Sequence, residues 1–376
     1  MKQTLLNNLK NLPGARINRK IVVFSVDDYG NVRLDSKKAL ENLKQNNIHP
    51  NGRFDELDTL ETTQDLEQLY EVLTSVKDKT GRNAAFTPYA LPCNIDFEAT
   101  QEKREFVPET LHKTWKRLKN EQPKAYENID KLWQEGMDNK IFIPQFHGRE
   151  HLNINLFNKS YAAGEAAVIQ NLKYKSLIAL PSRKDLPNVG FTQAFAFWDK
   201  SEIESHKEII KDGLQKFREV YGFDTTVFTP PAQQLHPELY AYIETLGVQA
   251  IDKPLYTNRH LGTGNYKKEF NKLGRSSGQN HITIVRNVVF EPTNGNIDHV
   301  GKALKQVEAA FRWNKPANIS SHRVNYCGHI DPQNRRLGLA ALKELLQRIV
   351  KKWPDVEFMG VDEMVRVVEG RWVVMR

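Results

Sequence analysis

Short apolar runs alternate with longer amphipathic segments along most of this chain of 376 residues. Residues 21–26 (IVVFSV) have the continuous apolar character of a buried strand, and residues 35–45 have helical spacing. The alternation predicts further strands at 84–87, 141–146, 226–229, 248–251, 282–285, 317–320 and 356–359, and helices at 65–76, 126–133, 200–221, 237–246, 334–351 and near Asp362. Repeated strand–helix units favour an α/β fold with a mainly parallel sheet.

Three polar stretches, near residues 96–124, 153–190 and 257–280, are longer than ordinary connections between a strand and a helix. We interpret them as insertions that shape a binding cleft. They interrupt a single domain that we expect over residues 21–376, after an N-terminal extension formed by residues 1–20. β/α barrels of this length often form one unit.

Charge and cysteine content argue against several classes of protein. The 54 Lys and Arg against 46 Asp and Glu give a net charge of +8, but the basic residues are scattered, so we expect no nucleic-acid partner. Attraction to an anionic glycan or membrane surface is a weaker alternative. Two cysteines cannot form a disulfide framework. Residues 1–20 lack a secretory signal and no apolar run approaches 18 residues, so we expect a cytoplasmic location and no membrane span.

Polar residues that could take part in catalysis or metal binding follow three of the predicted strands. Asp27 and Asp28 come directly after the first strand, and active sites of β/α barrels lie at such strand ends. Adjacent strand residues point to opposite faces, so both carboxylates reach one site only if the strand ends and turns there, which Gly30 makes easy. An ordinary Asp-Asp turn is the alternative.

His147 and His151 follow another predicted strand, and His322 closes a third. A spacing of four residues places two imidazoles on one face of a helical turn, close enough to bind one ion. A solvent-exposed helical pair and a purely structural His322 are the competing interpretations. A carboxylate and two imidazoles would leave room for an activated water, as in an open catalytic metal site.

Five segments resemble the motifs of NodB-type polysaccharide deacetylases, and they occur in the family's order. These segments are FSVDDYG around Asp27, HGREH from His147 to His151, FTPPA from Phe228 to Ala232, ISSH ending at His322, and the closing VEFMGVDEM. They span residues 21–364, nearly the whole chain. The resemblance implies the distorted (β/α) barrel of that family and a metal-dependent enzyme that removes N-acetyl groups from a saccharide.

The resemblance also implies a role for each matching residue. Asp28, His147 and His151 would hold one divalent metal ion, most plausibly zinc. Asp27 would be the general base, His322 the general acid, and a backbone N–H near Ala232 would stabilise the oxyanion. Asp252 matches loosely the carboxylate that keeps the catalytic histidine protonated.

The chain departs from the family pattern in the third motif. The arginine that orients the base is Thr229 here, and the aromatic residue is Ala232. We expect Arg286, at the end of the 282–285 strand, to take the place of this arginine, with Arg323 as a second option. Arg149 is a weaker third option because it lies between two candidate ligands. Pairing of Arg286 with Glu291 at the surface is the alternative.

Two other functions remain open. A glycoside hydrolase would need two carboxylates that flank a sugar bond. The only candidates are Asp27 together with Asp252 or Glu150. A catalytically silent carbohydrate-binding relative would retain the metal as structure, and the departures at Thr229 and Ala232 favour it. Asn325, Arg286 and Arg323 are further candidates for contact with the substrate.

Overall fold

The computed structural model describes residues 2–275 and 280–374. Its main sheet has ten strands and is parallel apart from the β10–β11 pair. The order is β10-β11-β7-β6-β5-β2-β1-β13-β12, and β14 pairs with the start of β1. The strands are β1 (Ile21–Tyr29), β2 (Phe86–Ala90), β5 (Gln145–Phe146), β6 (Val227–Phe228), β7 (Ala250–Lys253), β10 (Gly274–Arg275), β11 (Ile282–Val285), β12 (Val288–Val289), β13 (Ala317–His322) and β14 (Glu357–Phe358).

The sheet is curled, and a two-residue connection of the chain links a strand near one end of the sheet to a strand at the other end. Only Arg286 and Asn287 separate β11 from β12. β11 pairs with β7 near one end of the sheet, whereas β12 pairs with β13 at the other end. A step of two residues can connect these pairings only if the two ends lie close together. The α/β class and the distorted barrel predicted from the sequence are therefore confirmed.

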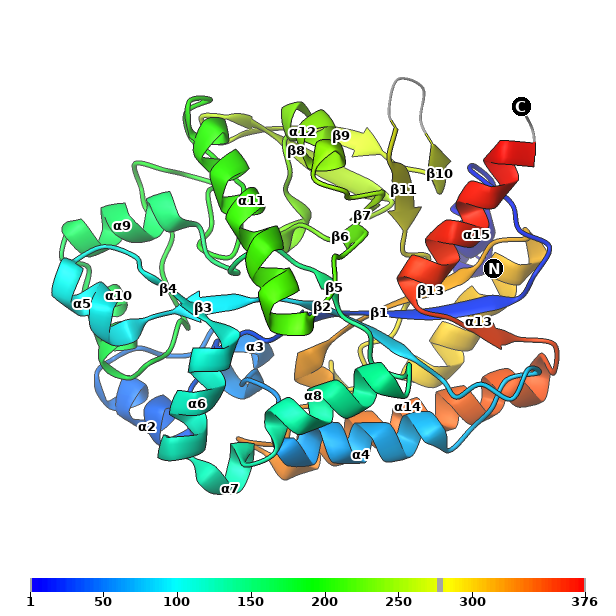
Figure 1. The fold of residues 1–376 in the computed structure, drawn as a ribbon, viewed down its shortest axis with the longest axis horizontal. Coiled ribbons are helices and arrows are strands. Elements are labelled where there is room, and N and C mark those ends of the chain that lie inside the picture. The colour runs from blue at the N-terminus through cyan, green and yellow to red at the C-terminus, as the bar shows by residue number, and fades with distance from the viewer. Residues whose placement is uncertain (1, 276–279, 375–376) are drawn as a thin grey trace.

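Helices surround this sheet (Figure 1). They are α1 (Lys2–Leu9), α2 (Lys37–Gln45), α3 (Arg53–Leu57), α4 (Thr63–Thr74), α5 (Phe97–Lys103), α6 (Leu111–Glu121), α7 (Pro123–Tyr126), α8 (Ile129–Asp138), α9 (Ile154–Ala162), α10 (Ala166–Lys173), α11 (Glu202–Tyr221), α12 (Tyr240–Thr245), α13 (His299–Arg312), α14 (Pro332–Lys352) and α15 (Val361–Val374). In Figure 1, α5, α9 and α10 lie at the opposite end of the molecule from both chain termini. No helix in the described ranges has the length and apolarity that crossing a bilayer requires.

The predicted strands and helices are present with shifted ends. The helix expected at 126–133 is divided between α7 and α8, and the one expected at 237–246 begins as a 3-10 turn. We did not predict α1, α13 or β12.

The insertions are structured. The first two contain β4 (Pro108–Thr110) and α5, α6, α9 and α10, and β4 pairs with β3 (Cys93–Ile95) just before the first insertion. The two insertions share an apolar cluster that includes Phe97, Phe106, Phe157 and Leu172. The third contains a hairpin of β8 (Tyr256–Gly262) and β9 (Asn265–Phe270), while residues 276–279 of the predicted stretch lie outside the described residues.

The barrel interior is apolar at the level where β1 begins. All nine residues of β1 are buried, and they alternate between two sides. Val22, Phe24 and Val26 join the large core beneath the surrounding helices. Ile21 and Val23 instead join interior residues of strands across the barrel, such as Val227 of β6 and Ile284 of β11, and apolar residues of α15. This alternation, which has a period of two, determines which later residues of each strand face the barrel interior.

Candidate metal centre and active site

Interior side chains become polar toward the carboxyl ends of the strands. Above Val23 in β1, Ser25 donates a hydrogen bond to Asn318 Oδ1 of β13 at 2.6 Å. Asp27 is the next residue of the same parity, and its register partner is His322. Strand alternation thus places the first carboxylate inside the barrel, at the end where sites of such folds lie.

Asp28 reaches the same site through a bulge. The pairing of β1 with β2 shifts register between Val26 and Tyr29, and Asp28 has a φ of 77°. A bulge of this kind redirects one side chain without ending the strand. Our expectation that the strand ends at Val26 and turns at Asp27 and Asp28 is therefore wrong, because β1 continues to Tyr29.

His147 and His151 lie in an irregular loop after β5, not on a helical turn as we expected. Gly148 has a φ of 97°, and a Cβ there would lie 3.0 Å from Pro231 Cγ. Glycine at position 148 is therefore required by the path of this loop. The loop brings the two imidazole centroids to 5.1 Å, and since His147 is 2% exposed, a solvent-exposed helical pair is excluded.

Asp28, His147 and His151 form the group of side chains, among the described residues, that could hold a metal ion. Their candidate ligand atoms lie within 4.8 Å of one another. Asp28 Oδ1 is 3.4 Å from His147 Nε2 and 3.3 Å from His151 Nε2. Burial lowers the pKa of His151 to about 4, so this imidazole is neutral near pH 7.

The protonation of His147 explains why this arrangement suits a cation. Its Nδ1 lies 2.7 Å from the carbonyl oxygen of Thr229, which only accepts, so Nδ1 carries the proton. In the neutral imidazole Nε2 is then an acceptor; it is buried, has no hydrogen-bond partner among the described residues, and lies 3.4 Å from Asp28 Oδ1. Backbone support of a histidine in this manner is common in metal sites. The donor set of one oxygen and two nitrogens fits a divalent ion such as zinc.

Arg286 forms a bidentate ion pair with Asp27. Nη1 and Nη2 each donate to one carboxylate oxygen of Asp27 at 2.7 Å, and Nε donates to Asp252 Oδ2 at 2.7 Å. Burial would raise the pKa of Asp27, but the charge and hydrogen bonds of Arg286 outweigh burial and hold this pKa below its usual value. The expected contact between Arg286 and Asp27 is present, and pairing of Arg286 with Glu291 is not. Thr229 leaves room for this contact, and its Oγ1 accepts from Arg286 Nη2 at 3.4 Å.

His322 is paired with Glu291. Its Nδ1 lies 2.7 Å from Glu291 Oε1, while Nε2 lies 3.6 Å from Asp27 Oδ2. Burial alone would lower the pKa of His322. The charges of Glu291, Asp27 and Asp28 and the hydrogen bond to Glu291 outweigh burial and raise this pKa to about 9. Our loose assignment of Asp252 as the partner of His322 is therefore wrong, because Asp252 is bound to Arg286.

These residues line one pocket of about 430 Å³. Its lining is Asp27, Asp28, Arg33, Phe54, His147, His151, Thr192, Pro230, Ala232, Gln233 and His322. Ala232 is at the expected place, and both Ala232 and Gln233 have left-handed backbone conformations, with φ of 49° and 58°. Whether the N–H of Ala232 binds an oxyanion stays a prediction.

Three residues expected to contact substrate do not line this pocket. Arg286 is bound to Asp27 and Asp252 behind it. Arg323 is 1% exposed and bound to Asp58 and Glu61. Asn325 is fully buried and bonded to Glu291 and Arg53. Their expected contact with the substrate is corrected accordingly. Arg149 pairs with Glu150 and Asp212, away from Asp27.

We did not predict a place in the site for Glu291, Arg33 or Phe54. Glu291 stands two residues beyond β12, a position at a strand end that would have singled it out if β12 had been predicted. Phe54 belongs to α3, and its ring contacts His322 edge-on at 5.2 Å. Arg33 and Phe54 carry no motif signal, because both lie in the connection between β1 and α4.

Comparison with known proteins gives similarity in structure alone. No family description matches the sequence, and no curated protein does. A solved structure from Parabacteroides distasonis, described as a glycoside hydrolase/deacetylase, matches with a TM-score of 0.50 and 8% identity over 94% of this chain and 72% of the other. What the two proteins share is the fold.

Other matches have lower TM-scores. A polysaccharide deacetylase from Mycobacterium smegmatis matches at 0.47, with 10% identity and coverage of 96% and 95%. A 4-alpha-glucanotransferase from Thermococcus litoralis matches at 0.45, with 10% identity over 93% of this chain, which spans only 40% of that protein's length. Several further matches are polysaccharide or peptidoglycan deacetylases.

Proposed function

We propose that this protein is a metal-dependent hydrolase that removes N-acetyl groups from a saccharide. The observation that carries the proposal is the bare, buried Nε2 of His147 facing Asp28 and His151, within one pocket that also contains Asp27 and His322. A divalent ion held by Asp28, His147 and His151 would supply a Lewis acid that polarises the amide and makes water acidic enough for a weak base.

Asp27 serves as that base. Its depressed pKa keeps it ionised at neutral pH, and Arg286 fixes both of its oxygens in place. Asp27 accepts a proton from the attacking water, whose oxygen forms a bond to the acetyl carbon. Arg286 thus does what the third-motif arginine does in the family that the sequence resembles.

His322 serves as the acid. Its pKa of about 9 keeps the imidazole protonated at neutral pH, and Nε2 is the nitrogen on the side of Asp27. When the C–N bond breaks, His322 donates its proton to the departing nitrogen, which leaves as a free amine together with acetate. Glu291 positions the ring from the other nitrogen.

The glycoside hydrolase alternative lacks a second carboxylate in position. Asp252 and Asp27 share one guanidinium and so cannot flank a sugar bond. Glu150 is buried against Arg149. The silent-relative alternative depended on the departures at Thr229 and Ala232. Arg286 supplies the contact with Asp27 that the arginine missing at position 229 would make.

The test is a product assay on zinc-loaded protein with a panel of N-acetylated mono- and oligosaccharides. We expect acetate and free amine in equal amounts, no new reducing ends, and loss of both products in Asp27→Asn. New reducing ends without acetate would support the glycoside hydrolase instead. Absence of any product from metal-loaded protein across the panel would support the silent relative.

A further inference from the structure

The pocket that contains the metal centre has three further polar side chains, Arg33, Thr192 and Gln233. The carboxylates and imidazoles of this pocket bind the ion or move protons in the proposed function, whereas these three side chains do neither. No side-chain hydrogen bond joins Thr192 or Gln233 to another described residue. Sites for small molecules orient their ligand through a few polar groups of this kind, and Arg33 is the charged one among them.

Arg33 uses only one edge of its guanidinium within the protein. Its Nε and Nη2 both donate to Asp55 Oδ1, at 3.2 and 3.0 Å. Nη1 has no hydrogen-bond acceptor among the described residues, and the side chain is 21% exposed. A guanidinium has five N–H donors in a planar arrangement. The edge formed by Nη1 and the second hydrogen of Nη2 is therefore unoccupied.

Asp55 holds this guanidinium in place. Asp55 is 4% exposed, and its Oδ2 accepts the N–H of Asn51 at 3.0 Å and that of Ala179 at 3.1 Å. The backbone of Arg33 is also fixed, because its carbonyl accepts the N–H of Leu177 at 2.7 Å. A guanidinium that is already oriented loses little side-chain entropy when a ligand binds to it.

Arg183 shows the contrasting case of a guanidinium whose contacts all lie within the protein. Its side chain is 18% exposed, close to the value for Arg33. Nε and Nη2 donate to the two oxygens of Asp185, and Nη1 donates to Glu165 Oε1. All three nitrogens of Arg183 are therefore engaged, whereas one nitrogen of Arg33 is left for a ligand.

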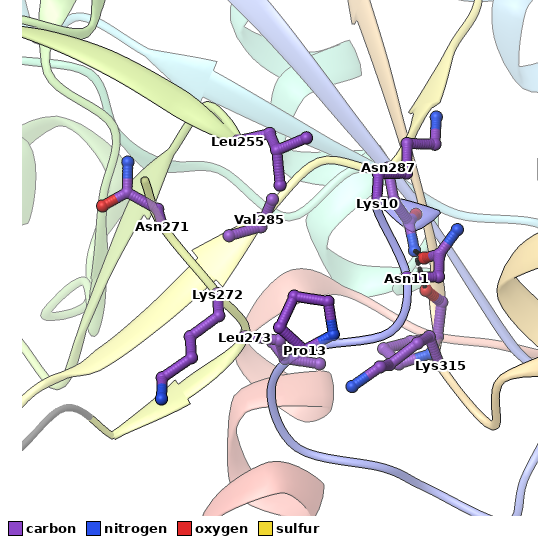
Figure 2. Close-up of a pocket in the computed structure, with 11 residues that line it drawn as sticks. Lys10, Asn11, Pro13, Leu255, Asn271, Lys272, Leu273, Val285, Asn287 and Lys315 are labelled. Carbon is purple, nitrogen blue, oxygen red and sulfur yellow. Dashed lines mark hydrogen bonds between the residues drawn. The ribbon is translucent and has the colours of Figure 1, made fainter. Parts of the chain in front are cut away.

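The pocket in Figure 2 is also basic, but it is too small for a sugar. Its lining includes Lys10, Lys272 and Lys315, and its volume is about 20 Å³. Lys315 Nζ donates to the carbonyl of Ala15 at 2.6 Å, so this ammonium already has a partner. A volume of this size has room for about one water molecule. This pocket therefore does not compete with Arg33 for an acidic saccharide.

We propose that the free edge of Arg33 binds a carboxylate of the substrate and thereby selects acidic N-acetylated saccharides. The planar fork of a guanidinium matches the two oxygens of a carboxylate. The net charge of +8 also favours the approach of an anionic saccharide. The inference rests on the proposed function, because it requires the acetamido group at the metal centre while the carboxylate meets Arg33 in the same pocket.

Calorimetric titration of zinc-loaded Asp27→Asn protein measures saccharide binding without turnover. N-acetylmuramic acid carries a carboxylate on the acetylated sugar itself, and a hyaluronan tetrasaccharide carries one on the neighbouring sugar. The methyl ester of each is the neutral counterpart. We expect at least one acid to bind at least about tenfold more tightly than its ester, the usual effect of a charge-assisted hydrogen bond. Adding Arg33→Met should abolish this preference.

Arg183→Met in the same background is the matched control and should retain the preference for the acid. Arg33→Lys retains the charge and can still pair with Asp55, but it lacks the fork, so it should lose most of the preference. Thermal melting of each variant establishes that it is folded. If Arg33→Met does not fold, Arg33→Lys decides the outcome.

Two results would overturn the proposal. One is equal binding of both acids and their esters, and the other is an undiminished preference in the Arg33 variants. Acetate release by the wild type separates this proposal from the proposed function. Equal release from acids and esters would refute only the role of Arg33, whereas an Arg33-dependent preference in binding with no acetate from any saccharide would refute only the deacetylase.

Discussion

Four residues around the pocket have left-handed backbone conformations. Asp28, Gly148, Ala232 and Gln233 all have positive φ, and only one of them is glycine. Such conformations cost on the order of 1–3 kcal/mol each for other residues and persist where the surroundings fix them. Their presence at the pocket is typical of a site whose geometry is maintained at a cost in stability.

Asp27 and Asp28 should respond differently to the same substitution. Asp28→Asn removes a charged candidate ligand and should weaken zinc binding measured by calorimetry. Asp27→Asn should leave zinc binding nearly unchanged and lower turnover by about 10²–10⁴-fold, the usual effect of losing a general base. Wild-type turnover in Asp27→Asn would show that the base lies elsewhere.

Glu291→Gln should lower the pKa of His322. The wild-type imidazole, raised to about 9, contributes stability below its ordinary pKa that is lost as pH rises through about 9. Without the Glu291 charge, the pKa should fall by roughly one to three units. NMR titration of metal-free protein measures it, and the alkaline limb of turnover should move the same way. A pKa that stays near 9 would contradict the role of Glu291.

At the scale of elements, the step from β11 to β12 determines the chemistry of the site. Alternate residues from Ile282 through Ile284 to Arg286 face the barrel interior. The guanidinium of Arg286 therefore enters the barrel where the two ends of the sheet meet. Arg286 also lies over the ring of Tyr89 at 5.0 Å, a favourable cation–π contact. One residue at this junction therefore contacts side chains from β1, β2 and β7.

Arg286→Met should destabilise the protein and inactivate it. It leaves Asp27 and Asp252 buried without a counter-charge, a change that typically costs about 3–5 kcal/mol. Arg286→Lys retains the charge but not the three-bond geometry, so we expect a smaller loss of stability with turnover still impaired. Urea unfolding and turnover measure the two effects. Thr229→Val, which removes the 3.4 Å contact with Arg286 but no charge, is the control and should have a much smaller effect.

A second buried arginine should act on the metal site from a distance. Arg323 binds Asp58 and Glu61, and Glu61 Oε2 accepts the N–H of Gly30, just after the bulge at Asp28. Arg323→Met should therefore weaken zinc affinity by about 10–100-fold as well as stability.

Arg335 provides the matched control for this prediction, since it makes a comparably buried pair with Asp65. Arg335→Met should lose similar stability in urea but retain zinc affinity. Equal zinc affinity in both variants would show that the Arg323 network is only structural.

The sequence predicts many of these elements because short apolar runs separated by amphipathic segments are visible in it. The apolar runs predict the strands. The polar residues that directly follow these runs include the candidate site residues Asp27, Asp28, His147, His151 and His322. The bulge at Asp28 and the loop from His147 to His151 do not follow, because both depend on register and on left-handed backbone that tertiary contacts impose. The helix α13 has clear apolar spacing and was simply not recognised.

At the scale of the whole molecule, the barrel is apolar at one end and polar at the other. Apolar residues of α15 pack with interior residues of the strands at the apolar end. The insertions with α5, α9 and α10 gather far from the termini. Such an arrangement could not be derived from the sequence, because the apolar cluster that joins the first two insertions connects segments up to about 100 residues apart.

The central claim is that Asp28, His147 and His151 bind a divalent metal ion, and calorimetric titration of metal-free protein with zinc tests it most directly. We predict one equivalent bound by the wild type and none by the double variant His147→Ala, His151→Ala. The double variant His206→Ala, His260→Ala removes two other buried histidines and should still bind one equivalent. Absence of zinc binding in the wild type, or undiminished binding in the His147, His151 double variant, would contradict the account.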